Sequence, residues 1–158
     1  MTRRIQRGQV SHIVNIKTQL RDLEAVKAAC SELGWEFVEN APTYASVNEY
    51  GAPVQNPCTH KIRVPGFNNE TNRPHYVFAL EIGLTKTAGA YSVSYDNLME
   101  QGEWPGSEDI SGIGKDACKL VSIYAAHKAT IEARNLGYSV NRVACDNGEI
   151  HLFVTGIN

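Results

Sequence analysis

The segment Leu33-Gly34-Trp35-Glu36-Phe37-Val38 takes the chain from a helix into a strand across one glycine, which indicates a fold that combines helices with a sheet. Upstream, Asp22 stands in the N-cap position of a segment with helical apolar spacing, and Gly34 follows that segment as a C-terminal cap. We therefore predict a helix over 22–33, followed by a strand at 35–38. Before it, residues 11–20 alternate in a way that predicts the first strand.

The same arrangement returns at Leu136-Gly137-Tyr138-Ser139-Val140. It follows the longest predicted helix, 115–136, whose apolar stripe runs through Ala117, Leu120, Tyr124 and Ile131, with His127 on the same line. The strands 138–145 and 149–154 should form a hairpin, because Asp146-Asn147-Gly148 is a strong turn signal. Both an internal duplication and two ordinary helix–glycine–strand junctions remain open as explanations.

The middle of the chain predicts short strands and loops. Strands are expected at 44–47, 60–64, 76–84 and 90–95, the last two as a hairpin. Pro65-Gly66 should end the strand at 60–64, and both 67–74 and 96–114 should be loops. We predict one α+β domain over 11–158, a two-layer sandwich of about six or seven mostly antiparallel strands and two helices. Residues 1–10 should be a flexible basic tail, and 41–114 a loop-rich middle.

Composition excludes several classes of protein. The 158 residues include 42% hydrophobic and 20% charged residues, with a net charge of −2. This balance argues against a dedicated nucleic-acid binder, and no apolar run is long enough to cross a bilayer. The start of the chain has no apolar segment typical of a secretory signal. Four cysteines without CxxC spacing then predict reduced thiols in a cytoplasmic protein, with Cys30 and Cys118 filling the core.

Two segments resemble a known family. They are Ser11–Thr18 with the helix that follows, and Tyr124–Lys128 through Ala133–Tyr138 to Asp146-Asn147-Gly148-Glu149-Ile150-His151-Leu152. Together they resemble the uncharacterised hypothetical chloroplast open reading frame thirty-five family, over about the outer half of the chain. Its members occur in plastids, bacteria and phages, which implies the plastid stroma or a phage host's cytoplasm. The family has no agreed activity or cofactor, so the resemblance leaves the function open.

Candidate ligand-binding residues lie in the middle of the chain. Gly112-Ile113-Gly114-Lys115 before a helix is a pattern that can bind an anion, although Asp116 opposes it and a plain loop-to-helix junction is the better explanation. Trp104 in the long loop could contact a ligand, a partner or the core. Arg63 and Arg73 supply cations for a phosphate.

Histidines and cysteines offer weaker candidates. Cys58, His60 and His75 have ligand types that zinc accepts, but a fourth ligand at motif spacing is missing, so we expect no metal and no cofactor. His127 is either a core residue or a general base.

Three functions follow from these observations. The first is a non-enzymatic binding module for a small polar or anionic ligand or a partner protein, with a homo-oligomer kept open. The second is a phage-encoded anti-defence protein that sequesters a nucleotide signal or blocks a host protein. The third is a small hydrolase or transferase that uses His127 or His75 as its base.

Overall fold

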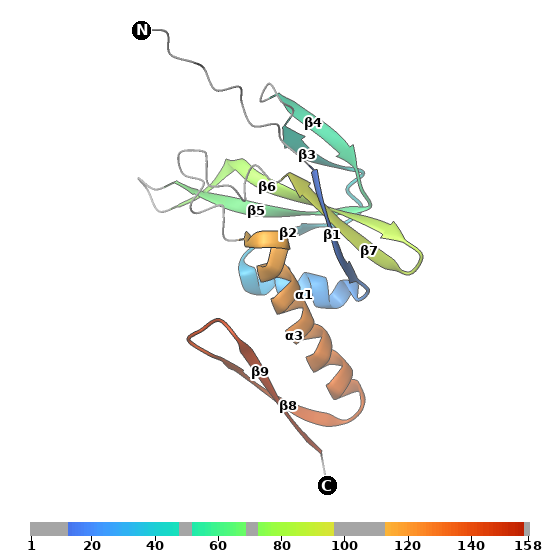
Figure 1. Ribbon diagram of the computed structural model, residues 1–158, viewed down its shortest axis with the longest axis vertical. Coiled ribbons are helices and arrows are strands. Elements are labelled where there is room, and N and C mark those ends of the chain that lie inside the picture. The colour runs from blue at the N-terminus through green and yellow to red at the C-terminus, as the bar shows by residue number, and fades with distance from the viewer. Residues whose placement is uncertain (1–12, 48–51, 69–72, 97–112, 157–158) are drawn as a thin grey trace.

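A five-stranded antiparallel sheet forms the centre of the molecule. The computed structural model describes residues 13–47, 52–68, 73–96 and 113–156. The sheet has the order β1-β7-β6-β5-β2, and its neighbouring strands are all antiparallel. Its strands are β1 (Ile13–Leu20), β2 (Glu36–Val38), β5 (His60–Asn68), β6 (Arg73–Thr87) and β7 (Ala90–Asp96). The two strands earliest and latest in this set, β1 and β7, therefore lie side by side (Figure 1).

Two helices cover one face of this sheet. Helix α1 (Leu23–Leu33) begins at Asp22, whose carboxylate accepts hydrogen bonds from the N–H groups of Glu24 and Ala25, and it ends at Gly34 in the left-handed conformation. Helix α3 (Cys118–Asn135) packs beside α1 and follows a short 3₁₀ turn, η3 (Lys115–Ala117). The core between helices and sheet contains, among others, Leu20, Val26, Ile62, Ile82, Val93, Tyr95 and Leu120.

A second, two-stranded sheet lies on the other face of the central sheet (Figure 1). Strands β3 (Thr43–Val47) and β4 (Pro53–Pro57) make it, and β3 contacts β6. The buried ring of Tyr44 lies directly over Gly83, where a Cβ atom would be 2.3 Å from the ring. The glycine is therefore what lets this layer approach the sheet.

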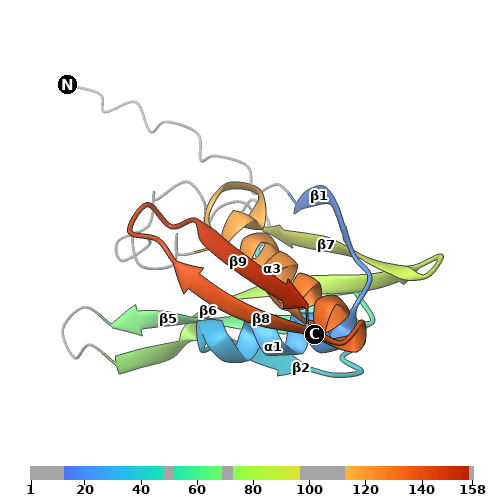
Figure 2. The same ribbon diagram turned by 90° about the horizontal axis from the view of Figure 1, so that it is seen from below.

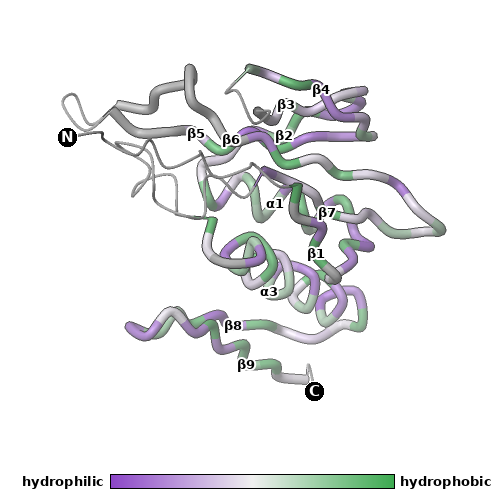
Figure 3. Tube along the Cα trace, turned by 45° about the horizontal axis from the view of Figure 1, so that its top comes forward, coloured by the Kyte–Doolittle hydropathy of each residue, from purple (hydrophilic) through white to green (hydrophobic). Residues whose placement is uncertain are grey.

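A third sheet is a hairpin on the far side of the helices. Among the described strands, β8 (Tyr138–Ala144) and β9 (Ile150–Gly156) pair only with each other, and the element that both mainly contact is α3. Figure 3 shows this hairpin as a separate layer beneath α3, and Figure 2, seen from below, shows it in front of α3. The core cluster contains no residue of β8 or β9. The hairpin is thus an addition to a core that is complete without it.

The predicted fold class is confirmed: the protein is an α+β sandwich with a mostly antiparallel sheet and two helices. Both caps of α1, the hairpin of β6 and β7, and the hairpin at Asp146-Asn147-Gly148 are also as predicted. Neither described helix has the length and apolar content that a membrane crossing needs.

The predictions for β4, for the end of β5 and for the start of α3 were wrong. Strand β5 continues through Pro65-Gly66 to Asn68, because a register irregularity between Val64 and Gly66 lets the pairing with β6 resume beyond it. Strand β4 was expected to be loop, since it begins and ends with proline. Helix α3 begins at Cys118 rather than Lys115, because Asp116 and Ala117 both have left-handed backbone conformations.

Candidate functional site

The predicted ligand-binding residues do not form one described site. Arg63 lies on β5, where its Nε is 3.1 Å from Glu81 Oε1 and its NH1 is 3.5 Å from Glu36 Oε2. Arg73 begins β6, and its backbone pairs with Asn68. The side chains of Arg73 and Lys115, and the whole of Trp104 and Gly112, lie outside the described residues. Two carboxylates already balance the charge of Arg63, so this cation is less available to an anion than the sequence suggested.

The glycine junction before α3 has a geometry that differs from the expected one. Gly114 has φ 73°, and an added Cβ atom would lie 2.4 Å from the sulfur of Cys118. The helix begins three residues after Lys115, and no side chain caps its first turn. Lys115 is therefore not at the first turn of the helix, where the unpaired N–H groups of α3 would meet an anion. The anion site at this junction stays a prediction.

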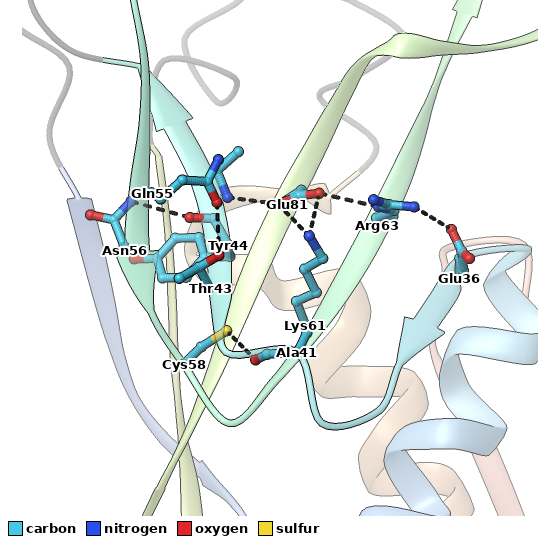
Figure 4. A network of polar contacts seen from close by, with 11 residues as sticks. Glu36, Ala41, Thr43, Tyr44, Gln55, Asn56, Cys58, Lys61, Arg63 and Glu81 are labelled. Carbon is cyan, nitrogen blue, oxygen red and sulfur yellow. Dashed lines mark hydrogen bonds and ion pairs between the residues drawn. The ribbon is translucent and has the colours of Figure 1, made fainter.

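Figure 4 shows a polar network that joins the central sheet to the outer β3–β4 layer. The buried carboxylate of Glu81 is 3.0 Å from Lys61 Nζ and accepts the N–H of Ala45 at 2.6 Å. Burial alone would raise the pKa of Glu81, but the hydrogen bonds from Ala45, Lys61 and Arg63 hold it below its ordinary value. Every charge in this network has a partner, which is the pattern of a structural tie between layers.

Two of the three candidate zinc ligands, Cys58 and His60, are engaged in other contacts. The thiol of Cys58 donates to the carbonyl oxygen of Ala41 at 3.1 Å. Buried His60 accepts the N–H of Asn40 on Nδ1 and lies between the rings of Phe37 and Tyr91. The side chain of His75 is outside the described residues, and among the described ones no group of three metal-ligating residues is present.

The two cysteines predicted to fill the core differ. Burial raises the pKa of the Cys30 thiol to about 12, as a core position implies. Cys118 is exposed, and that prediction was wrong. It is the first residue of α3, although the helix start itself lies in the core, because Ala117 and Leu120 are fully buried.

His127 lies in a cluster that the sequence did not reveal. Its Nε2 is 2.7 Å from Glu32 of α1, and Arg142 of β8 donates two hydrogen bonds of 2.6 Å to the same carboxylate. The hydrogen bonds from Arg142 lower the pKa of Glu32, against a smaller opposing effect of burial. Glu32 thus ties both helices to the hairpin. Glu32 is 95 positions from His127 and 110 positions from Arg142 in the chain, so no local spacing could have signalled the cluster.

The most unusual surface of the described chain belongs to the hairpin. Of the seven most exposed large apolar side chains, five lie at the end of α3 or on the two strands after it. We name these five the hairpin surface: Leu136, Tyr138, Val143, Phe153 and Val154, with Phe153 54% exposed. A two-stranded ribbon has one face for the helix and one for solvent, and here both faces carry exposed apolar residues.

A groove separates the hairpin's turn from α3. It has a volume of about 730 Å³, and its walls are Ser122, Ala125 and Ala126 of α3 together with residues 147–152. Within it, Glu149 Oε2 is 3.3 Å from His151 Nε2. Hydrogen bonds from Asn147 and His151 lower the pKa of Glu149, so the groove carries a carboxylate at neutral pH. This charge disfavours an anionic occupant.

Sequence reasoning placed the hairpin correctly but missed its surface. One signal was available: β9 reads Ile-His-Leu-Phe-Val-Thr-Gly, with apolar residues on both faces instead of strict alternation. A strand buried on both faces would give the same pattern, so only the position of β9 outside the core identifies it as exposed.

Comparisons with family models, with curated proteins and with solved structures return no match to this chain. The resemblance to the chloroplast open reading frame thirty-five family therefore stays a prediction.

Proposed function

We propose that this protein is a non-enzymatic binding module, and that the hairpin surface is where it meets a partner protein. The observation that carries this proposal is the concentration of exposed apolar side chains on one hairpin outside the core. Burying them in the monomer would have been favourable, because each buried aromatic ring removes roughly 150–250 Å² from water. Their exposure fits a surface that becomes covered on association.

The chemistry of this surface also favours a protein partner. Interfaces are enriched in aromatic residues and depleted of charge at their centre. Tyr138 and Phe153 supply the aromatic rings, and β9 contains no Lys, Arg, Asp or Glu. Among the side chains on the helix-facing side of the hairpin, Arg142 is the one cation, and Glu32 neutralises it. The surface therefore has an apolar centre that no unpaired charge interrupts.

A small ligand in the groove is the second candidate. A volume of about 730 Å³ lies within the range of small-molecule sites, roughly 300–1,000 Å³. With Glu149 ionised, the groove suits a neutral or cationic molecule better than the anion that the sequence suggested. The anti-defence protein and the histidine-dependent hydrolase or transferase stay predictions, because no described contact favours either.

Paired charge insertions test the proposal. Phe153→Lys places a charge in the hairpin surface, while Val54→Lys makes the same change at an exposed apolar residue of β4. Each tagged variant is compared with the wild-type protein for association with a second copy and with proteins of its own host. We expect association that survives Val54→Lys and is lost with Phe153→Lys. Association that is equal in all three proteins, or none in any of them, would overturn the proposal.

A further inference from the structure

The strand edges of this protein differ in how they are protected against pairing with another chain. Exposed edges recruit other strands unless charges, prolines, bulges, short length or covering groups prevent it. Edge strand β1 has a register irregularity, and edge strand β2 has only three residues. In the outer layer, β4 has two prolines, and Glu81 covers the N–H of Ala45 on β3. Strand β8 carries Arg142.

Strand β9 has none of the protections that lie in a strand's own sequence and pairing. It has seven residues, no proline, no permanently charged side chain and no irregularity in its pairing with β8. Its composition has the high β-propensity and low charge of segments that pair readily with other strands. Among the strands that the structure describes, β9 is therefore the edge best suited to accept another strand.

The hydrogen-bonding direction of β9 follows from the turn. The N–H of Cys145 donates to the carbonyl oxygen of Glu149 at 2.8 Å, so these two residues form a hydrogen-bonded pair. Such pairs alternate along an antiparallel ladder, which directs the backbone groups of His151, Phe153 and Thr155 toward β8. The backbone groups of Ile150, Leu152, Val154 and Gly156 consequently point to the open edge.

We propose that β9 pairs antiparallel with β9 of a second copy of this chain, so that two hairpins form one four-stranded sheet. This inference rests on the proposed function, and it identifies the partner protein as a second copy of this chain. Full overlap of the seven-residue strand places the two-fold axis at its middle residue, Phe153. In this register, Leu152 exchanges backbone hydrogen bonds with the partner's Val154, and the two Phe153 residues form the non-hydrogen-bonded pair at the axis.

The side chains of β9 suit pairing with itself. On the outward face, Phe153 meets its own copy and His151 meets Thr155, so no two equal charges face each other. On the helix-facing side, Leu152 meets Val154 and Ile150 meets Gly156. A two-fold interface must be complementary to itself, and this strand satisfies that condition in the same register that gives complete backbone pairing. Because β9 has no permanently charged side chain, it has little with which to select a charged strand of a different protein.

Cysteine crosslinking tests the register. Residues of a non-hydrogen-bonded pair have Cα atoms about 4.5 Å apart, within the range that a disulfide bridges. Phe153→Cys should therefore give a disulfide-linked dimer under mild oxidation. Thr155→Cys is the matched control, because two copies of it would lie four residues out of register, about 13 Å apart. The wild-type protein measures the background from its four native cysteines.

A backbone substitution separates this inference from the proposed function. Val154→Pro removes an N–H that points to the open edge and leaves the N–H groups that serve β8, so the hairpin itself is retained. We expect dimer dissociation constants to rise at least about tenfold for both Val154→Pro and Phe153→Lys. The measurement is sedimentation equilibrium, with Val54→Lys as the control.

The outcomes are distinguishable. A wild-type protein that stays monomeric at the highest accessible concentration overturns β9 pairing, and so does a dimer that crosslinks through position 155 but not 153. The proposed function survives either result if Phe153→Lys still abolishes binding of a host protein. A dimer that tolerates Val154→Pro but not Phe153→Lys shows docking on the hairpin face, which overturns edge pairing alone.

Discussion

At the scale of single residues, close packing decides whether the outer layer can lie on the sheet. Gly83→Ala would place a Cβ atom 2.3–2.4 Å from the ring of Tyr44, which is buried and has little room to move. We expect a loss of about 1–3 kcal/mol in the free energy of unfolding, measured by urea denaturation. Gly156→Ala is the control: its added Cβ atom would be 3.9 Å from the nearest ring, and stability should change little.

The carboxylate of Glu32 predicts a dependence on pH. Hydrogen bonds from Arg142 lower the pKa of Glu32 in the folded protein. The ion pair's contribution to the free energy of unfolding is therefore fully present above the pKa that Glu32 has in the unfolded chain. That contribution is lost as the pH falls through the lowered folded-state pKa. Because Glu32 is about one-third exposed, solvent screens its ion pair. We therefore expect Glu32→Gln to lower the free energy of unfolding by only about 1 kcal/mol at neutral pH.

Denaturation of wild type and Glu32→Gln between about pH 7 and pH 3 measures this effect. The difference in the free energy of unfolding between wild type and Glu32→Gln should shrink as the solution becomes more acidic. Glu132→Gln is the matched control, since Glu132 is 63% exposed and 3.6 Å from Lys128. A Glu32 effect that stays constant over this range would mean that lost packing, rather than the ion pair, is responsible.

At the scale of elements, α3 fixes the start of α1. The hydroxyl of Tyr124 accepts hydrogen bonds from the N–H groups of Arg21 at 2.9 Å and Asp22 at 3.2 Å. Tyr124→Phe would leave both donors without this acceptor beside the buried ring, and we expect a loss of about 1–3 kcal/mol in urea denaturation. Tyr138→Phe, at a ring 44% exposed, should have no comparable effect.

The elements that sequence could predict are those specified locally. Asp22 and Gly34 determine the ends of α1, and Asn147-Gly148 determines the last turn, because each acts within a few residues. The continuation of β5 beyond Pro65 depends on pairing with β6, and β4 exists because β3 lies beside it. The candidate surface was missed for a related reason: exposure of Phe153 depends on what packs against β9 in three dimensions.

At the scale of the whole molecule, the hairpin and the core should be separable. All core residues, and the partly buried residues packed against them, precede β8. A chain ending at Gly137 should keep cooperative unfolding and the near-ultraviolet circular dichroism of the packed core, with somewhat lower stability because Arg142 no longer pairs with Glu32. It should also be monomeric. Loss of the cooperative transition would show that the hairpin is needed for folding.

The position of the hairpin after the whole core has a consequence for synthesis of the protein. All five strands of the central sheet, including the pair β1 and β7 that closes it, precede β9 in the chain and are synthesised before it. The unprotected edge is therefore made after the strands that form the central sheet. Neighbouring nascent chains on one messenger consequently cannot join through β9 until these strands have been synthesised.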